Sequence, residues 1–374
     1  MILKNSTMQE FMSNSQGKMI VAFGDGLMLQ DMLKLESEYQ IVKHIEFIID
    51  NDKRKWGRPI YTPFGRILNV FSVDKLLEYD ADRLIIIITS ERYPEMIQQL
   101  DDMAELDLAE CYIYPIMHSF EHRKYQIPEY EGDYLIPPVI HYCWFGKNDF
   151  PDNVEKCMES WKKECPDYEI VRWDESNYDV NKNAYISEAY KVGAYAYVSD
   201  YARLDILYQN GGIYLDTDIE LLKPLDELRK TEAFGGFLHH GARIDTGIGF
   251  GSIRGNELLK EFMSLYFYER YISDGGVNRG LNAASVTRVL KYYGLKQDGS
   301  YQVIKGMACY PREFFDPLSY VLGIDQRTED TYSIHYGNMS WSDEGYYSLK
   351  NIRKRSKETK MEILNRLGLG ENSR

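Results

Sequence analysis

Residues 199–220 read SDYARLDILYQNGGIYLDTDIE, and this stretch decides the fold of the second half of the chain. Its opening Ser-Asp pair predicts the start of a helix, and a Gly-Gly pair ends the apolar run that follows. A short apolar strand then leads into Asp216-Thr217-Asp218. Because side chains alternate along an extended backbone, Asp216 and Asp218 are expected to point to the same side of the strand.

Two carboxylates at a strand end are candidate ligands for a divalent cation. The preceding helix would present Asp200 and Arg203 one turn apart, next to Asp216 and Asp218. Hard cations such as Mg²⁺ and Mn²⁺ take oxygen ligands and commonly link one or two carboxylates to substrate phosphates. The pattern therefore indicates transfer from a nucleotide diphosphate donor, whereas an isolated Asp-x-Asp pair usually does no more than stay solvated.

The block around the acid pair is more specific than the pair itself. Ser-Asp-x-x-Arg-x-x-x-Leu followed by Gly-Gly-Ile-Tyr-x-Asp-x-Asp resembles the sugar-binding region of family 32 glycosyltransferases. This family includes bacterial capsule and lipopolysaccharide sugar transferases and yeast initiating mannosyltransferases. Three further blocks resemble the family in the expected order, so that the resemblance covers about residues 135–345. They lie at residues 136–146, at 160–174, and at Ile334-His335 with Ser340-Trp341.

The resemblance implies a fold and a reaction. The implied fold is the α/β nucleotide-sugar transferase sandwich of the GT-A type. The implied reaction is metal-dependent hexosyl transfer with retention, using Mn²⁺ or Mg²⁺. We expect a UDP-sugar donor and a glycan or lipid-linked acceptor of surface polysaccharide synthesis.

The resemblance also implies roles for single residues. Asp216 and Asp218 would hold the metal with His335 as a third ligand, and Asp200 and Arg203 would hold the donor sugar and ribose. The other donor-side candidates are Trp144, stacked on the nucleobase, and Gly212, Ser340 and Trp341. The acceptor-side candidates, in a Gly-rich stretch, are His239, His240, Asp245 and Thr246.

Several of these residues have a plainer interpretation. His335 can be a structural histidine, Trp144 a core residue, and Asp200 a helix N-cap that pairs with Arg203. His141 lies on the opposite strand face from Trp144, and we expect it to be structural. The glycines at 211–212 are expected to permit a tight turn and close backbone approach.

Residues 18–120 alternate between strand and helix patterns, which predicts a Rossmann-like, parallel, doubly wound sheet. The Gly24-Asp25-Gly26 turn resembles half of a dinucleotide fingerprint, with Leu29 in the place of the third glycine. Asp50 lies about 20 residues further on, where a ribose-binding acid would fall. Either a nucleotide site or a scaffold that binds no cofactor fits this pattern. The expected strands are 18–23, 44–49, 84–89 and 111–114, and the expected helices are 27–38, 73–79 and 94–103.

The predicted organisation has four parts. A Rossmann-like α/β domain covers residues 1–125 and a linker covers 126–138. The GT-A glycosyltransferase domain covers 139–345, and a basic helical tail covers 346–374.

The charge of −14 argues against a nucleic-acid partner. Residues 349–374 carry eight basic and three acidic side chains, or +5, which leaves −14 − 5 = −19 for the rest. We expect this tail, with an apolar stripe at Met361, Leu364 and Leu367, to contact an anionic membrane surface, or else to be a helix packed on the transferase domain.

Five cysteines without a Cys-x-x-Cys pair fit free thiols in a reducing cytoplasm. The sequence shows neither an apolar signal core nor a membrane span. The expected location is therefore the cytoplasm, at the inner face of the membrane.

Three other functions compete with sugar transfer. A phosphatase would use Asp216 in an Asp-x-Asp-x-Thr pattern, but Glu220 stands at the fifth position. A nicotinamide-dependent enzyme would place its chemistry in the N-terminal domain. A non-catalytic sugar-binding module would not need the intact pair Asp216 and Asp218.

Overall fold

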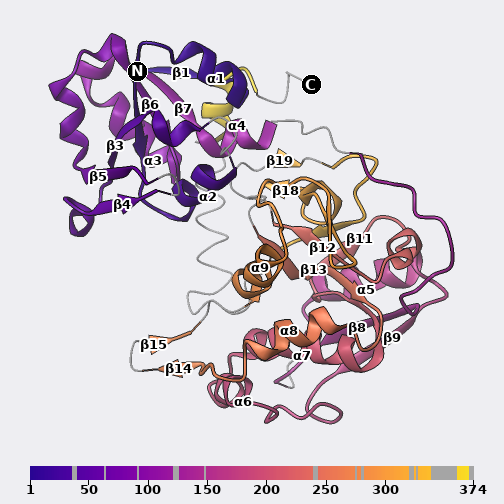
Figure 1. Cartoon of the computed structure of the whole chain (residues 1–374). Helices are drawn as coiled ribbons and strands as arrows, with labels where there is room; N and C mark the ends of the chain where they lie inside the picture. The colour runs from indigo at the N-terminus through magenta and orange to yellow at the C-terminus, as the bar shows by residue number, and fades with distance from the viewer. Residues whose placement is uncertain are drawn as a thin grey trace. The chain divides into compact units, whose positions relative to one another are not determined.

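The computed structural model describes residues 1–35, 40–62, 65–90, 92–120, 126–146, 149–238, 243–273, 276–278, 282–319, 324–325, 327–337 and 360–369. Contacts divide the chain into two compact units (Figure 1), and we describe each by itself. Unit 1 comprises Met1–Lys124, Ser319–Ile324 and Leu349–Arg374, and unit 2 comprises Tyr125–Leu318 and Asp325–Ser348. Unit 1 therefore combines the first and the last segments of the sequence.

Unit 1 is built on one seven-stranded sheet. In order across the sheet, its strands are β1 (Ile2–Lys4), β7 (Glu110–Ile113), β6 (Leu84–Ile88), β2 (Met19–Phe23), β3 (Ile45–Ile49), β5 (Ile67–Phe71) and β4 (Pro59–Tyr61). All neighbours run parallel except β4, which is antiparallel to β5. The chain winds outward from β2 in both directions, which is the doubly wound arrangement.

Helices cover both faces of this sheet. One face packs against α1 (Met8–Asn14), α2 (Leu27–Leu35) and α4 (Tyr114–Phe120). The other packs against α3 (Tyr93–Asp101), the 3-10 helix η4 (Val73–Glu78) and a helical turn at residues 360–366. Strand β6 is buried along its whole length, because both of its faces are covered. Four shorter 3-10 helices are η2 (Ile41–Lys43), η3 (Lys53–Lys55), η5 (Ala81–Arg83) and η6 (Ala104–Leu106).

The four predicted strands of this region are confirmed as β2, β3, β6 and β7. The helix predicted over residues 73–79 is a 3-10 helix, η4. Strands β1, β4 and β5 and helix α1 were not predicted. They are short, and β4 and β5 carry exposed side chains at alternate positions instead of a continuous apolar run.

The C-terminal apolar stripe lies in the core of unit 1. Ile363 and Leu364 are 3% and 2% exposed and join the cluster of Val21, Ile86 and Cys111. Arg366 donates to Asp101 on α3 at 2.7 Å. The predicted packing of the stripe on the transferase domain was therefore wrong, because the stripe packs in unit 1. The predicted contact with an anionic membrane stays a prediction. The basic residues at 350–357 lie outside the described residues, and none of the described helices combines the length and apolar character of a membrane span.

Unit 2 is built on a second, mixed seven-stranded sheet. Its order is β16 (Gln302–Ile304), β17 (Met307–Tyr310), β12 (Ala233–Phe237), β13 (Ile244–Ser252), β10 (Gly212–Tyr214), β8 (Val139–Cys143) and β9 (Glu169–Trp173). Strand β8 is parallel to both β9 and β10, whereas β13 is antiparallel to both β10 and β12. The carboxyl ends of β8 and β10 therefore lie at the same edge of the sheet.

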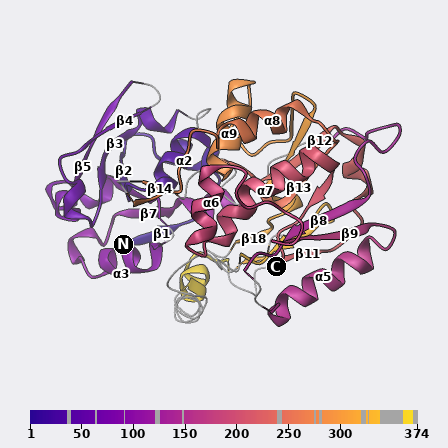
Figure 2. The ribbon, with the colours of Figure 1, turned by 90° about the horizontal axis from the view of Figure 1, so that it is seen from below.

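Helices also cover both faces of the second sheet. One face packs against α6 (Ala184–Lys191), α7 (Tyr195–Asn210), α8 (Glu257–Ser264) and α9 (Asn282–Tyr292). The other packs against α5 (Asp152–Glu164), η7 (Asp226–Lys230) and η8 (Arg312–Phe314), and Figure 2 shows α5 and α7 on opposite sides of β8 and β9. Small two-stranded pairs are β11 (Ile219–Leu221) with β20 (Ser333–His335), β14 (Ile272–Ser273) with β15 (Gly276–Val277), and β18 (Leu318–Ser319) with β19 (Ile324–Asp325).

Candidate active site at the carboxyl edge of the second sheet

Helix α7 supplies Asp200 and Arg203 to the candidate site. The helix begins at Tyr195, so Asp200 lies within it, and the N-cap interpretation of Asp200 was wrong. The apolar residues on both sides of Asp200 bury the helix almost completely, and Arg203 is only 3% exposed. The two side chains lie one turn apart and form an ion pair at 3.2 Å.

The guanidinium of Arg203 is the centre of the site. Its Nη2 lies 3.2 Å from Oδ1 of Asp200 and 3.1 Å from Oδ1 of Asp216, and its Nη1 lies 3.9 Å from Oδ1 of Asp245. The plane of the group lies over the ring of Tyr214, 4.9 Å from its centroid. Three carboxylates from α7, the β10–β11 turn and β13 thus converge on one buried cation.

Asp216 and Asp218 lie in a turn and not on a strand. Strand β10 ends at Tyr214, and the N–H of Ile219 donates to the carbonyl of Asp216 at 3.1 Å. The prediction that alternation along a strand aligns the two carboxylates was therefore wrong. The turn and a bond from the N–H of Asp216 to the carbonyl of Gly247 fix their positions instead.

Strand pairing brings His335 to the acid pair. The turn runs directly into β11, which pairs antiparallel with β20, and His335 stands opposite Ile219. The N–H of Tyr336 donates to the carbonyl of Asp218 at 3.1 Å. As a result, Nε2 of His335 lies 3.6 Å from Oδ1 of Asp218, although more than a hundred residues separate the two in sequence.

Burial and mutual repulsion shift the titration of these acids. Burial raises the pKa of Asp200 to about 7, against the attraction of Arg203, and Asp245 and Asp216 add to the rise. Burial also raises the pKa of Asp216, with a further contribution from Asp218. For His335, burial opposes the charged form, but Asp218, Asp316 and Asp216 outweigh it and raise the pKa.

The donor set suits a divalent cation of the Mn²⁺ or Mg²⁺ type. Two carboxylates and an imidazole adjoin one turn, and the 3.6 Å between Asp218 and His335 is near the distance of about 3 Å between neighbouring ligands of an octahedral ion. As the side chains stand, the described residues contain no group of three His, Cys, Asp or Glu side chains arranged to hold a metal ion. Asp216 is instead bonded to Arg203.

Three residues of the site were missed in the sequence. Asn282, the first residue of α9, donates to Asp200 at 3.0 Å and accepts from Thr246 at 2.8 Å. Gly247 lies against Asp216 and Arg203, where an added Cβ would be 2.2 Å from the Asp216 carboxylate. Asp316, 2% exposed, lies 4.0 Å from Nδ1 of His335. Asn282 and Asp316 stand outside the motifs, so that only the fold brings them to the site. Gly247 lies in the Gly-rich stretch next to Thr246 but was not singled out there.

The acceptor-side candidates are partly connected to this cluster. Asp245 lies beside Arg203 and accepts from the N–H of Gly247 at 2.7 Å, and Thr246 is bonded to Asn282. The acceptor-side candidates His239 and His240 and the donor-side candidates Ser340 and Trp341 lie outside the described residues.

Trp144 lies just beyond the carboxyl end of β8. In the register of β8 and β10, His141 pairs with Tyr214, so Trp144 and Asp216 both follow the ends of neighbouring parallel strands. The indole of Trp144 is partly buried and packs on Phe150 with ring centroids 4.7 Å apart. Trp144 is thus packed on unit 2 and partly exposed, one residue beyond the end of β8.

His141 is structural, as predicted, and the two glycines make the tight turn and close backbone approach predicted for them, although Gly212 was also a donor-side candidate. His141 is 3% exposed; its Nε2 is bonded to the carbonyl of Gly211 and its Nδ1 accepts from the indole of Trp173. Gly212 has φ +107°, and an added Cβ there would lie 2.8 Å from the carbonyl oxygen of Val139. Gly212 stands at the start of β10, at the opposite end from Asp216, so the structure does not bring it to the cluster.

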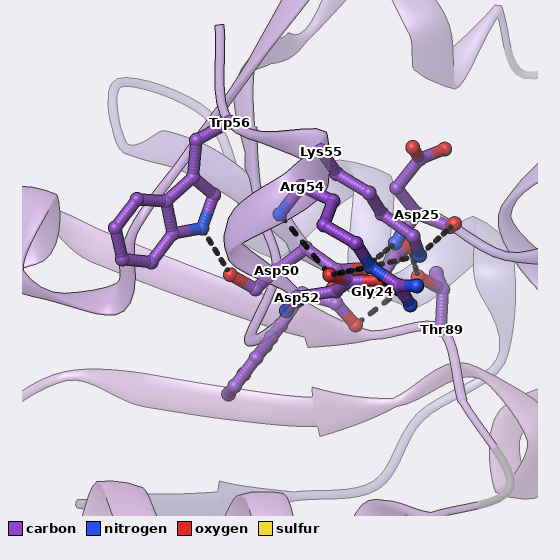
Figure 3. Close-up of polar contacts among 9 residues, drawn as sticks. Gly24, Asp25, Asp50, Asp52, Arg54, Lys55, Trp56 and Thr89 are labelled. Atoms are coloured by element: carbon purple, nitrogen blue, oxygen red, sulfur yellow. Dashed lines mark hydrogen bonds and ion pairs between the residues drawn. The ribbon is translucent and has the colours of Figure 1, made fainter. Parts of the chain in front are cut away.

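In unit 1, the Asp50 carboxylate joins the ends of two strands (Figure 3). It accepts from the N–H of Asp25 at 2.7 Å, the N–H of Asp52 at 2.8 Å and Nζ of Lys55 at 2.9 Å. Burial alone would raise the pKa of Asp50, but these bonds outweigh it and lower the pKa. The carboxylate therefore ties the turn after β2 to the end of β3.

Comparisons with known proteins bear on the region around α7. Residues 151–235 match the family described as "Glycosyltransferase sugar-binding region containing DXD motif". The matched region includes Asp200, Arg203, Asp216 and Asp218, and it supports a glycosyltransferase. It does not extend to Trp144, His335 or unit 1.

Two curated relatives come from the fission yeast Schizosaccharomyces pombe. Inositol phosphoceramide mannosyltransferase 1 is 30% identical over 110 residues, which cover 26% of this chain and 33% of the relative. Inositol phosphoceramide mannosyltransferase 3 is 36% identical over 97 residues, which cover 25% and 27%. The chain thus spans about a third or less of the length of these relatives. Both are fungal, so the bacterial capsule and lipopolysaccharide branch stays a prediction.

A solved structure, PaToxG Glycosyltransferase, is 17% identical and covers 42% of this chain and 68% of its own. Its TM-score of 0.33 is too low to support an argument about the fold.

Proposed function

We propose that this protein is a metal-dependent, retaining glycosyltransferase. It would move a hexose from a nucleotide diphosphate donor, specifically a UDP-sugar, to a glycan or lipid-linked acceptor. The observation that carries the proposal is the convergence of Asp200, Asp216 and Asp245 on the buried guanidinium of Arg203 beside the Asp218–His335 pair. The family match around this cluster supports the same class of enzyme.

Each side chain has a role in this proposal. Asp216, Asp218 and His335 would hold the divalent ion, which when bound neutralises the charge that builds on the leaving nucleotide diphosphate. Arg203 offers fixed N–H donors to a phosphate or to sugar hydroxyls, with Asp200 oriented by Asn282 next to it. Trp144, at the same sheet edge, offers a flat ring to the base.

The retaining outcome we propose follows a front-face course. The bond from the anomeric carbon to the phosphate oxygen breaks, and a bond to the acceptor oxygen forms on the same face. The proton of the acceptor hydroxyl passes to the departing phosphate oxygen. Arg203 would stabilise the charge on that oxygen as it leaves.

The acceptor is the least specified part of the proposal. The two fungal relatives carry a lipid, inositol phosphoceramide, in their names, which supports a lipid-linked acceptor over a free glycan. We retain surface polysaccharide synthesis at the cytoplasmic side of the membrane as the proposed setting, based on the sequence resemblance.

The test combines Mn²⁺ with a panel of nucleotide sugars and measures donor hydrolysis. We expect one UDP-sugar to be hydrolysed by the full chain and Asp218→Asn to lose turnover at saturating Mn²⁺, while its melting temperature and circular dichroism stay close to wild type. Near-normal turnover of Asp218→Asn would refute the metal assignment. Absence of hydrolysis across the panel, with and without acceptor lipids, would refute the transferase.

A further inference from the structure

Asp316 is a buried carboxylate that no sequence motif marks. It follows η8, is 2% exposed, and its N–H donates to the carbonyl of Arg312 at 2.7 Å. A carboxylate is costly to bury unless charged or hydrogen-bonding partners stabilise it. The ring of His335 lies next to it, with Nδ1 4.0 Å from Oδ1 of Asp316.

The imidazole of His335 lies between two carboxylates. Nε2 lies 3.6 Å from Asp218 in the acid turn, and Nδ1 lies 4.0 Å from Asp316 on the opposite side of the ring. A histidine that binds a metal through one nitrogen commonly donates its other N–H to a carboxylate, which fixes both the tautomer and the ring orientation. A shift of about 1 Å would bring Nδ1 of His335 and Oδ1 of Asp316 from 4.0 Å to hydrogen-bonding distance.

Hydrogen bonds join the chain segment that carries Asp316 to the segment that carries His335. The N–H of Tyr332 donates to the carbonyl of Phe314 at 2.7 Å, and the hydroxyl of Thr331 donates to the carbonyl of Glu313 at 2.7 Å. The ring of Phe315 packs against Gly236 and Gly249, where an added Cβ would lie 2.5 and 3.0 Å from it. The backbone next to Asp316 is therefore fixed relative to β20 and to the main sheet.

We propose that Asp316 is a positioning residue, which holds the imidazole of His335 so that Nε2 faces Asp218 and the divalent ion. The inference rests on the proposed function for the metal, but not on the identity of the sugar or the acceptor. Asp316 acts through His335 and does not touch substrate in this proposal.

The experiment titrates Mn²⁺ alone into the full chain and measures free Mn²⁺ by electron paramagnetic resonance. We expect Asp316→Asn and Asp316→Ala to weaken Mn²⁺ binding about 10- to 100-fold, the usual effect of losing a carboxylate behind a metal-binding histidine. The second readout is the ¹⁵N spectrum of the His335 ring, assigned with His335→Gln. We expect both Asp316 variants to shift these resonances in the metal-free protein.

The matched control is Asp205→Asn on α7. Asp205 is likewise buried, at 5% exposure, and it accepts from the hydroxyl of Tyr178 at 3.0 Å, away from His335. It should lose stability without loss of Mn²⁺ affinity. Equal Mn²⁺ affinity in wild type and Asp316→Asn, or an equal loss in Asp205→Asn, would overturn the proposal. So would weaker binding with unchanged His335 resonances, which would make Asp316 a ligand.

The proposed function fails in a different way. If the Asp316 variants weaken Mn²⁺ binding but the wild-type chain hydrolyses no nucleotide sugar, the positioning role of Asp316 stands and the proposed transferase activity is refuted. A wild-type chain that binds no Mn²⁺ contradicts both.

Discussion

Gly247 is the smallest residue of the site and one of the most constrained. It lies on β13 with its backbone N–H bonded to Asp245 and its carbonyl bonded to the N–H of Asp216. The space that a side chain would need is taken by Asp216 and by the guanidinium of Arg203. The absence of a Cβ thus permits the close packing of a cation and an acid from two other elements.

We expect Gly247→Ala to abolish the proposed donor hydrolysis while the fold persists. The new methyl would lie 2.2 Å from Oδ2 of Asp216 and 2.7 Å from Nη1 of Arg203, so both side chains must move. A displacement of about 1 Å at a reacting group costs on the order of 100-fold in rate. The measurement is kcat/KM for the donor, with circular dichroism as the check on folding.

Gly235→Ala is the matched control, on the neighbouring strand β12. An added Cβ there meets the end of the flexible Met307 side chain at 2.8 Å and none of the site residues. It should lower the melting temperature and keep the rate. A Gly247→Ala enzyme as active as Gly235→Ala would show that the acid and the arginine tolerate the methyl.

At the scale of elements, short strands do much of the positioning. The three residues of β11 connect the acid turn to β20, and that pairing alone carries His335 to Asp218. Similarly, the side chain of His141 on β8 joins the turn before β10 to Trp173 on β9. Such links hold neighbouring strands of the second sheet in register.

The His141 link predicts a pH dependence of stability. Trp173 can only donate, so Nδ1 of His141 accepts and the ring is neutral with its proton on Nε2. Burial lowers the pKa of His141 from 6.5 to about 4. Between these values the unfolded chain binds more protons than the folded one, so the free energy of unfolding rises with pH from about 4 to about 6.5, by about 3 kcal/mol from this group.

Urea unfolding at a series of pH values measures this dependence. Trp173→Phe removes the donor to Nδ1, so the pKa of His141 should rise and the slope between pH 4 and 6.5 should become shallower. The prediction fails if the His141 ring titrates near 6.5 in the folded wild type by NMR.

The sequence predicts elements where apolar residues form long runs, and it fails where tertiary pairing decides. The buried strands β2, β3 and β6 and the roles of His141 and Gly211 followed from such patterns. The turn at Asp216–Asp218 did not, because its bonds run to Gly247 and β20, far away in sequence. Asn282 and Asp316 lie outside every motif, and only the packing of α9 and η8 brings them to the site.

At the scale of the whole molecule, unit 1 depends on the last segment of the chain. Ile363 and Leu364 cover the part of the first sheet that α3 and η4 do not cover. Met361, Leu367 and Leu369 pack around them. Arg366 and the amino terminus both pair with Asp101, so the two ends of the sequence meet at one carboxylate. The packing partner of the apolar stripe could not be recognised from the tail alone, because that partner is a sheet made of residues 1–124.

We expect Ile363→Ala and Leu364→Ala each to destabilise unit 1 by about 2–5 kcal/mol, because each leaves a cavity in a buried cluster. Hydrogen exchange at the buried amides of β6 measures the unfolding of unit 1, while donor hydrolysis reports on unit 2. Glu362→Ala, on the exposed side of the same helix, should change neither signal. A loss of less than 0.5 kcal/mol in both core variants, which is the level of ordinary surface substitutions, would contradict the packing.

The position of this helix sets the order in which the protein can finish folding during synthesis. Most domains fold from the amino end as they leave the ribosome, at roughly 5–20 residues per second. Here residues 1–124 acquire their closing helix only when residues 360–369 follow. For roughly ten to fifty seconds of translation the nascent sheet exposes the apolar face that the helix later covers. A chaperone that binds apolar surfaces on nascent chains would therefore meet unit 1 with one face uncovered, at a stage when residues 125–348 are already synthesised.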